Sequence, residues 1–340
     1  MRFLLRRLAW SIFVVWGVVS LAFVISRIVP GDPARMVAGA QARPADVERI
    51  RKQLGLEDPG LVQYARFWGR LVHLGPRQID PKNDPAHANC AVLVPLGAAS
   101  VHLDLGKSFL KRQPVVDLIA TRLPRTLALA AAGMFLQLLL GLGTGMLAAV
   151  RRDSWLDRFL VGTSLIGISA PTFLIALVLQ NVLARGLGWL PLDGFGTSFA
   201  DHVRCLVLPA LTLGIYGAAY YTRLVRDEMV VLLRQDWVRT ARAKGLSPIQ
   251  VVLRHGLRNA LVPIVTAVGL DFGALLGGAV VTETVFRWPG LGDLSVKALL
   301  ERDGPIILGC VIVSSVAIVG ANVVVDAVYA RLDPRVTRTG

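Results

Sequence analysis

Four residues in the N-terminal third carry side chains that often bind transition metals. They are His73, His87, Cys90 and His102. Imidazole nitrogens and thiolates are the usual ligands of zinc, but this spacing matches neither a CxxC pair nor a Cys/His finger. The other two cysteines stand far away in the chain, so a disulfide framework is not indicated either. We therefore interpret the four as ordinary loop residues and expect no metal site.

A second group looks like the end of a phosphate-binding loop. Gly106, Lys107 and Ser108 match its last positions, but the motif needs another glycine five residues before its final glycine. That position is occupied by Val101. We therefore expect no nucleotide site, no catalytic residue and no cofactor in this chain.

Three carboxylates lie within or beside strongly apolar stretches, namely Asp271, Glu283 and Asp326. Ionisable groups at membrane depth are functional candidates by default, so we take these three as a candidate substrate path. Each also has a structural alternative. Asp271 could serve helix packing, Asp326 could lie near the inner headgroups, and Glu283 could hold a turn beside Pro289 and Gly290.

Composition indicates which elements would position these groups. Of the 340 residues, 54% are hydrophobic and only 18% are charged, whereas soluble proteins carry about 25% charged residues. The net charge of +14 does not indicate a nucleic-acid partner, because the basic residues flank apolar runs, where they set topology. We expect an all-α polytopic membrane protein whose surroundings are lipid.

Six apolar segments predict six transmembrane helices. They cover residues 8–30, 123–150, 159–183, 206–221, 260–281 and 306–329. The first segment is too long for the apolar core of a signal peptide, so we expect it to remain as a span. Pro171 lies inside the third, and membrane helices tolerate proline where neighbouring helices satisfy the backbone.

The basic residues predict an orientation. If Met1 is cytoplasmic, the short cytoplasmic segments hold 17 Lys and Arg residues and the short outer loops hold five, as the positive-inside rule requires. Both termini are then cytoplasmic, in a multi-pass protein of the cell (inner or cytoplasmic) membrane. The expected domains are a first helix at 1–30, an extracytoplasmic region with short helices at 31–122, and a core of five spans at 123–340.

The extracytoplasmic region is the only long hydrophilic part of the chain. Pro44 and Pro59 each mark the start of a short helix. Residues 75–99 are rich in Pro, Asn and Asp and are expected to form a surface loop.

Glycines in the fifth apolar segment recur every four residues, at Gly269, Gly273 and Gly277. Small residues at this spacing let two helices approach closely. Packing within the chain and contact with a partner subunit both fit the pattern.

The stretch 236–263 is a basic island between two apolar segments. Gly245 ends a first short helix, Ser247 can cap a second, and Gln250 stands at the capping-box position. The expected product is a bent pair of short helices at 236–258 in the cytoplasm. A solvated loop on anionic lipid is the alternative, but it needs neither bend nor caps. A compact knob suits insertion into a cleft on another protein.

Motifs in the island and elsewhere carry a family resemblance. In the island they are Thr240-Ala241-Arg242-Ala243-Lys244-Gly245, Arg254-His255 and Leu257-Arg258-Asn259-Ala260. Elsewhere they include Ile28-Val29-Pro30-Gly31-Asp32-Pro33, Arg122-Leu123-Pro124-Arg125-Thr126-Leu127, Trp288-Pro289-Gly290-Leu291-Gly292 and Asp333-Pro334-Arg335. Together they resemble ABC importer permeases of the dipeptide/oligopeptide/nickel group. The chain departs from the general Glu-Ala-Ala loop at Arg239, Thr240, His255 and Arg258, and residues 75–103 match no part of the family.

The resemblance implies a type I ABC importer permease. The residues that it carries over as ATPase-docking are Arg239, Thr240, Ala241, Arg242, Ala243, Lys244, Gly245, Leu246, His255 and Arg258. It implies as partners a second homologous permease subunit, two cytoplasmic ABC ATPase subunits that bind ATP and Mg, and an extracytoplasmic substrate-binding protein.

The function that the resemblance implies is ATP-driven import of di- or oligopeptides by alternating access. Nickel complexes, glutathione and oligosaccharides use related permeases and stay open as substrates. An ion-gradient secondary transporter is a rival class, but the expected pair of repeated halves with matched broken helices is not evident in the sequence. A membrane-anchored scaffold without transport is a third class.

Overall fold

The computed structural model describes residues 2–28, 33–39, 41–53, 55–76, 87, 89–96 and 99–332. The chain forms two compact units. The helical unit comprises Met1–Ala9, Arg125–Asp293 and Ala317–Gly340, and the sheet unit comprises Trp10–Pro124 and Leu294–Val316.

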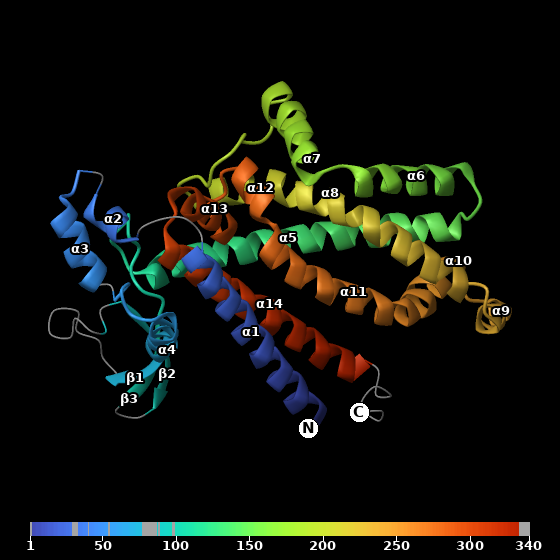
Figure 1. Cartoon of the computed structure of the whole chain (residues 1–340). Helices are drawn as coiled ribbons and strands as arrows, with labels where there is room; N and C mark the ends of the chain where they lie inside the picture. The colour runs from blue at the N-terminus through green and yellow to red at the C-terminus, as the bar shows by residue number, and fades with distance from the viewer. Residues whose placement is uncertain are drawn as a thin grey trace. The chain divides into compact units, whose positions relative to one another are not determined.

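Long helices build the helical unit (Figure 1). In chain order its elements are α5 (Val115–Val150), α6 (Trp155–Ser169), α7 (Thr172–Leu179), the π-helix η1 (Gln180–Gly186), α8 (Phe199–Leu232), α9 (Asp236–Ala243), α10 (Pro248–Gln250), the π-helix η2 (Val251–Gly256), α11 (Leu257–Gly278) and α12 (Val280–Val285). Helix α13 (Leu291–Glu301) begins in this unit and α14 (Gly304–Leu332) ends in it. Helix α8 is central, because α5, α6, α7 and α11 all contact it.

Glycines let α5 and α8 approach closely. A Cβ on Gly145 would lie 2.7 Å from the Thr222 carbonyl oxygen, and a Cβ on Gly141 would overlap the Cβ of Tyr221. These glycines are four residues apart, which is the small-residue spacing of close helix pairs in membranes. The close pair of α5 and α8 thus adds a second place where this spacing occurs, besides the fifth segment.

In that fifth segment, which forms α11, Gly273 packs against α14 of the same chain. Its Cβ would lie 3.4 Å from Oδ1 of Asn322 and 3.5 Å from Cγ2 of Ile318, both in α14. Packing within the chain therefore accounts for this position of the glycine stripe.

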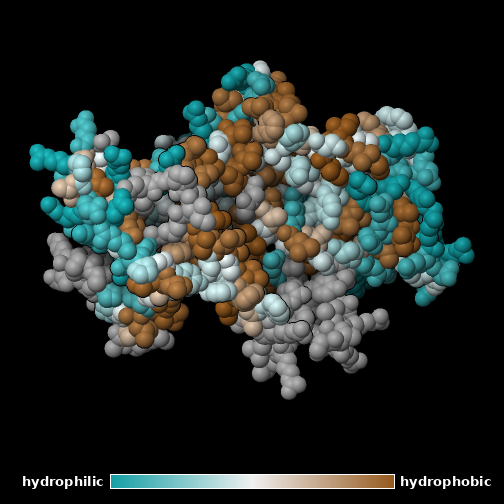
Figure 2. Space-filling model, viewed as in Figure 1, coloured by the Kyte–Doolittle hydropathy of each residue, from teal (hydrophilic) through white to brown (hydrophobic). Residues whose placement is uncertain are grey.

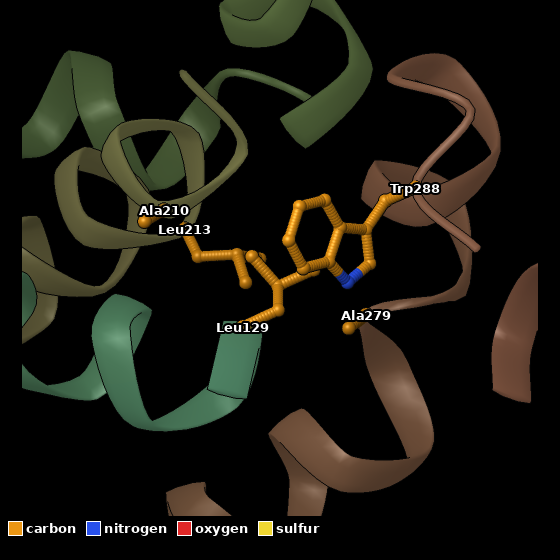
Figure 3. Packing of buried hydrophobic residues seen from close by; sticks show 5 residues of the cluster. All are labelled: Leu129, Ala210, Leu213, Ala279 and Trp288. Atoms are coloured by element: carbon orange, nitrogen blue, oxygen red, sulfur yellow. The ribbon is translucent and has the colours of Figure 1, made fainter. Parts of the chain in front are cut away.

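A buried tryptophan closes one end of the helical bundle. Trp288 is 2% exposed and packs with Leu129 of α5, Ala210 and Leu213 of α8, and Ala279 (Figure 3). Its indole N–H donates to the Arg125 carbonyl at 3.0 Å, so the buried N–H keeps a hydrogen-bond partner. The cluster joins the start of α5 to the turn that follows α12.

The third apolar segment is broken, and the expectation of one helix through Pro171 is wrong. Helices α6 and α7 meet there at 107°, and Ala170 is extended with φ −77° and ψ 128°. Proline lacks the N–H that an α-helix needs and pushes the preceding residue out of the α region. The proline therefore ends α6 and begins a new direction.

Three described helices are long and apolar enough to cross a membrane: Val115–Val150, Phe199–Leu232 and Gly304–Val324. The count rises to five if two bent pairs are each one span, namely Trp155–Ser169 with Thr172–Gly186, and Val251–Leu261 with Pro263–Leu276. Helix α1 (Arg2–Ile28) adds a shorter apolar stretch at Ala9–Ile25. In Figure 2, hydrophobic side chains cover the middle of the helical unit, and hydrophilic ones gather at the end formed by α9 and α10. The chain is a multi-pass membrane protein, and the count of six spans stays a prediction.

The sheet unit contains short helices and a small antiparallel sheet. Its elements after α1 are α2 (Pro33–Ala38), α3 (Pro44–Gln53), α4 (Gly60–Leu71), β1 (Val72–Pro76), β2 (Cys90–Leu96) and β3 (Ala99–Asp104). The strand order is β1-β3-β2. Helix α4 packs on α1 through Tyr64 and Phe67, whose ring centroids lie 5.5 and 5.2 Å from that of Phe23.

The sheet contradicts two expectations. Residues 75–99 were expected to be a loop, yet they include the end of β1, all of β2 and the first residue of β3. The all-α fold class holds for the helical unit but omits this sheet. Strands β2 and β3 were missed because each is a short apolar run flanked by turn-forming residues, without the length that separates an element from a loop.

Candidate docking site

Helix α9 separates an apolar face from a basic one. Val238 and Ala241 are buried against Val251 of η2. On the other face, the predicted docking residues are exposed: Arg239, Thr240, Arg242, Ala243 and Lys244. Ala241, also predicted to dock, instead holds α9 to the body of the protein.

Gly245 ends α9 as the sequence predicts. Its φ is +83°, which glycine adopts without steric strain. Apart from its chain neighbours, no described atom lies within 4 Å of the position that its Cβ would take. The predicted capping box after the bend is confirmed, because the Ser247 N–H donates to Gln250 Oε1 at 3.0 Å and the Gln250 N–H donates to Ser247 Oγ at 3.3 Å.

The second helix is not a separate short element, contrary to the expectation. Helix α10 continues through η2 into α11 without a gap. The reason is that its buried face continues through Gly256, Ala260 and Ile264. A Cβ on Gly256 would lie 2.8 Å from Cε of Met229, so the chain runs close to α8 at this point.

A buried cluster lies next to η2, where the basic segment joins the helical unit. It consists of Ala149 of α5, Val225 and Met229 of α8, and Ala260 and Ile264 of α11. Close-packed interiors transmit displacement rather than absorbing it. The cluster therefore holds α5, α8 and α11 together as one packed group.

Basic side chains surround the bend. The exposed ones are Arg239, Arg242, Lys244, Arg254 and Arg258. The guanidinium of Arg239 lies 4.0 Å from the Asp236 carboxylate, but the Arg239 side chain is 87% exposed, and such surface pairs contribute little. The bend thus presents positive charge to solvent.

The remaining docking candidates, Leu246 and His255, are partly buried. Leu246 packs on the cluster of Val238 and Ala241. The ring centroid of His255 lies 6.2 Å from that of Trp237. Leu246 and His255 are therefore partly packed within the segment formed by α9, Gly245, α10 and η2, and partly lie on its surface.

Asp271 joins three helices. Gln137 Nε2 of α5 donates to its Oδ2 at 2.5 Å, and the Tyr221 hydroxyl of α8 donates to the same oxygen at 3.3 Å. Gln137 and Tyr221 are buried, whereas Asp271 is partly exposed. Helix packing accounts for these contacts, and the role in a substrate path stays a prediction.

Glu283 is fully buried in α12, just before the turn that leads to α13. Its Oε1 accepts from the Thr126 hydroxyl at 2.7 Å and its Oε2 from the Asp293 N–H at 3.1 Å. Burial raises the pKa of the Glu283 carboxyl, and these hydrogen bonds act in the opposite direction. Gly290 packs against this carboxylate so closely that a Cβ there would overlap it. The structural-turn interpretation explains these contacts, and contact with substrate stays a prediction.

The third candidate of the substrate path, Asp326, has a side chain outside the described residues. Asp271 and Glu283 have different hydrogen-bond partners, which are Gln137 of α5 and Tyr221 of α8 for Asp271, and Thr126 of α5 and Asp293 of α13 for Glu283. The structure does not bring these two together in one site.

The apparent phosphate-loop fragment has a structural contact. The Ser108 hydroxyl donates to Asp303 Oδ2 at 2.6 Å, and the Leu110 N–H donates to the same oxygen at 3.2 Å. Asp303 is fully buried just before α14. Ser108 thus fixes the start of that helix.

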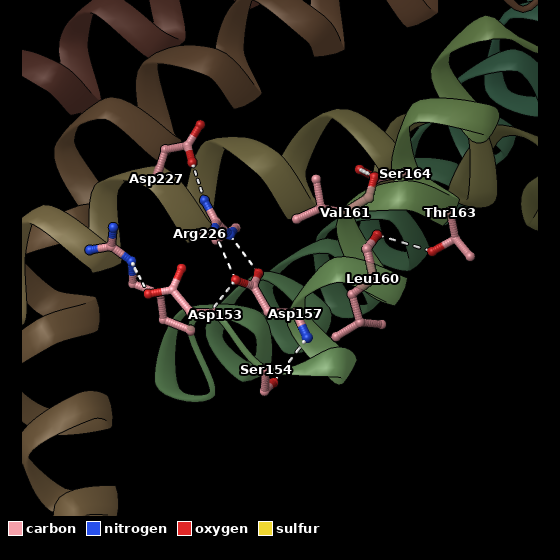
Figure 4. Close-up of polar contacts among 10 residues, drawn as sticks. Asp153, Ser154, Asp157, Leu160, Val161, Thr163, Ser164, Arg226 and Asp227 are labelled. Carbon is pink, nitrogen blue, oxygen red and sulfur yellow. Dashed lines mark hydrogen bonds and ion pairs between the residues drawn. The ribbon is translucent and has the colours of Figure 1, made fainter.

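One buried ion pair was not anticipated. Arg226 of α8 donates through Nε to Asp157 Oδ1 at 2.6 Å and through a terminal nitrogen to Oδ2 at 2.8 Å (Figure 4). The side chains are 22% and 4% exposed. In the structure Ser154 caps α6 by accepting from the Asp157 N–H, and nothing in the sequence indicated Arg226 as the partner of Asp157.

Comparison with known proteins identifies the family. The model of the binding-protein-dependent transport system inner membrane component matches residues 141–338, and the model of the N-terminal part of such membrane components matches residues 1–130. A putative peptide transport system permease protein of Brucella abortus (strain 2308) is 38% identical over 337 residues, which is 98% of each chain. The glutathione transport system permease protein GsiC of Escherichia coli (strain K12) is 38% identical over 336 residues, which is 99% of each chain.

A solved structure supports the fold independently. The inward-facing MetNI methionine ABC transporter matches with a TM-score of 0.55 at 19% identity, covering 65% of this chain and 98% of that chain. The family models span both the helical and the sheet unit. This chain therefore belongs to the binding-protein-dependent transport system inner membrane components, the permease subunits of ABC importers.

Proposed function

We propose that this chain is one of two homologous permease subunits of an importer that moves di- or oligopeptides across the cytoplasmic membrane. Two ABC ATPase subunits would bind the ATP and Mg, and an extracytoplasmic binding protein would deliver the substrate. The permease itself is a transport subunit and not an enzyme. Nucleotide-driven closure of the ATPases would bias its two access states.

The observation that carries this proposal is the knob formed by α9, the Gly245 bend and α10. Its exposed face is basic and faces solvent, while its buried face continues into α11 and packs on α8. This arrangement suits a surface that receives force from another protein. The exposed arginines and Lys244 would orient docking through charge complementarity.

We infer the orientation from the expected number of spans and from the distribution of basic residues. With six spans, counting each bent helix pair as one and including α1, both termini and the knob lie in the cytoplasm. The positive-inside rule favours this orientation, because the basic residues concentrate in the knob, in the α5–α6 connection and at the termini.

Peptides are the proposed substrates because relatives of near-identical length are named for peptide and glutathione transport. Glutathione is itself a small peptide, so both names point to one substrate class. Nickel complexes and oligosaccharides remain alternatives within the same architecture.

Reconstitution of the complete importer in proteoliposomes tests the proposal. Uptake of labelled di- and oligopeptides should require ATP, both ATPases and the binding protein, and should survive an ionophore. Glutathione, a nickel chelate and an oligosaccharide serve as competing substrates in the same assay. Uptake that runs on an ion gradient without the ATPases would establish the secondary-transporter class instead.

A further inference from the structure

Three histidines that are far apart in sequence converge on one face of the small sheet. His73 of β1 lies directly opposite His102 of β3 in the strand register. His87 precedes β2, and its carbonyl accepts from the Cys90 N–H at 3.0 Å. The ring centroids of the three histidines are 5.1 to 5.5 Å apart, and one ligand nitrogen from each lies within 4.8 Å of the other two.

Backbone carbonyls indicate which nitrogen carries the proton in the His102 and His73 rings. His102 Nε2 lies 2.9 Å from the Pro76 carbonyl oxygen and 2.8 Å from Ser100 Oγ. A carbonyl only accepts, so Nε2 carries the proton and Nδ1 presents a lone pair. By the same reasoning His73 donates from Nδ1 to the Arg70 carbonyl at 2.8 Å, which leaves the lone pair on Nε2. Backbone carbonyls commonly orient metal-binding histidines in this way.

The His102 ring supplies a second, independent indication of a ligand. His102 is fully buried, and its Nδ1 has no hydrogen-bond partner among the described groups. An unpaired buried acceptor costs free energy. A cation at the centre of the three rings would satisfy this nitrogen.

Cys90 is the candidate fourth ligand. Its Sγ lies 3.7 Å from His73 Nε2, close to the ~3.6 Å that separates sulfur and nitrogen ligands of one tetrahedral zinc ion. The histidine nitrogens would need to close to about 3.3 Å from one another, which requires shifts of about 1 Å or less.

Gly75 leaves room for the rings. A Cβ at this position of β1 would lie 2.8 Å from His87 Nε2 and 2.9 Å from His102 Cε1. The strand therefore carries the one residue type that lets the two imidazoles approach its backbone.

We propose that His73, His87, His102 and Cys90 bind a zinc ion that ties together the three strands of this sheet. Three imidazoles and a thiolate suit zinc or a neighbouring late transition metal and not magnesium or calcium, which prefer oxygen ligands. The site lies wholly within the sheet unit and is independent of the transport proposal.

Metal binding to the full-length chain tests this proposal. The chain is purified in detergent without a polyhistidine tag, stripped with a chelator, and titrated with Zn²⁺ against a chromophoric competitor. One zinc per chain is expected. His87→Ala and His102→Ala should weaken binding by more than the roughly 10–100-fold that loss of an outer-shell partner costs. His202→Ala, in the helical unit, is the matched control and should bind as the wild type does.

Two further variants keep the test independent of misfolding. Gly75→Ala removes no ligand, yet its methyl group should displace the His87 ring and weaken zinc binding. Cys90→Ser should abolish the thiolate-to-cobalt charge-transfer band of the Co²⁺-substituted chain. The proposal is overturned if the wild type binds no stoichiometric zinc, or if the His87, His102 and Gly75 variants bind as His202→Ala does. An unchanged cobalt spectrum in Cys90→Ser removes Cys90 from the ligand set.

Discussion

At the scale of single residues, charges in this chain are held in two different ways. Asp157 and Arg226 satisfy each other through two hydrogen bonds, and Asp157 also accepts from the Asp153 N–H at 2.9 Å. Glu283 is satisfied by a hydroxyl and a backbone N–H. A buried charge is tolerated only when such partners replace water. Asp157 therefore fixes the contact of α6 with α8, and Glu283 fixes the contact of α12 with α5 and α13.

Removal of Asp157 should destabilise the chain strongly. Asp157→Ala leaves the Arg226 guanidinium without its buried carboxylate, and breaking such a pair costs about 3 kcal/mol. Thermal unfolding in detergent measures the loss. The matched control is Arg152→Ala, because Arg152 pairs at 3.4 Å with an Asp153 side chain that is 79% exposed. Equal losses for the two variants would show that the buried pair is not a major contributor.

At the scale of elements, the bend at Gly245 determines what the knob presents. Helix α9 points its buried face at η2, and the capping box turns the chain into α10. Because α10 runs on into α11, the knob is the end of a long helix and not a flexible loop. This helix packs on α8 through Gly256 and bends by 56° between Leu261 and Pro263.

Gly245 variants separate backbone strain from blocked docking. Gly245→Ala and Gly245→Trp both place a side chain at φ +83°, which costs about 1–2 kcal/mol. Only the tryptophan also fills the open space beside the bend. Copurification of the ATPase should fall at least ~10-fold for the tryptophan variant, as for a hot-spot contact, and much less for the alanine variant.

The matched control for this experiment is Gly188, which also has positive φ (+64°) and, apart from its chain neighbours, no described atom within 4 Å of its Cβ position. Gly188→Trp lies between η1 and α8 and should retain the ATPase. If Gly245→Trp retains it equally well, the bend is not the docking surface.

At the scale of the whole molecule, the membrane determines which surfaces meet which partners. Large exposed hydrophobic side chains, such as Phe135, Ile166 and Leu270, are 64%, 71% and 69% exposed in the isolated chain. Lipid or a second permease subunit would cover such side chains. The basic knob, by contrast, must lie in water.

Cysteine labelling tests the orientation. In a background without the three native cysteines, Lys244→Cys in the knob and Thr197→Cys before α8 are both at exposed positions. In intact cells that express the chain without its ATPases, an impermeant maleimide should label position 197 directly. Position 244 should react only after permeabilisation. Labelling of position 244 from outside would reverse the orientation.

The sequence alone determined the membrane class, the apolar helices and the capped bend at Gly245 and Ser247. These depend on composition, on apolar run length and on hydrogen bonds between near neighbours, all of which are local. It misjudged Pro171 because the tolerance of a helix for proline depends on neighbours that are not visible in sequence.

Only the tertiary structure decided which distant residues meet. It paired Arg226 with Asp157, fused α10 to α11 over α8, and gathered His73, His87 and His102 on one sheet face. Strand register and helix packing create these contacts, and neither leaves a fixed spacing in the chain. The sequence thus determined that this protein lies in a membrane and where its basic segment bends, and the packed fold determined which helices pack together and which histidines meet.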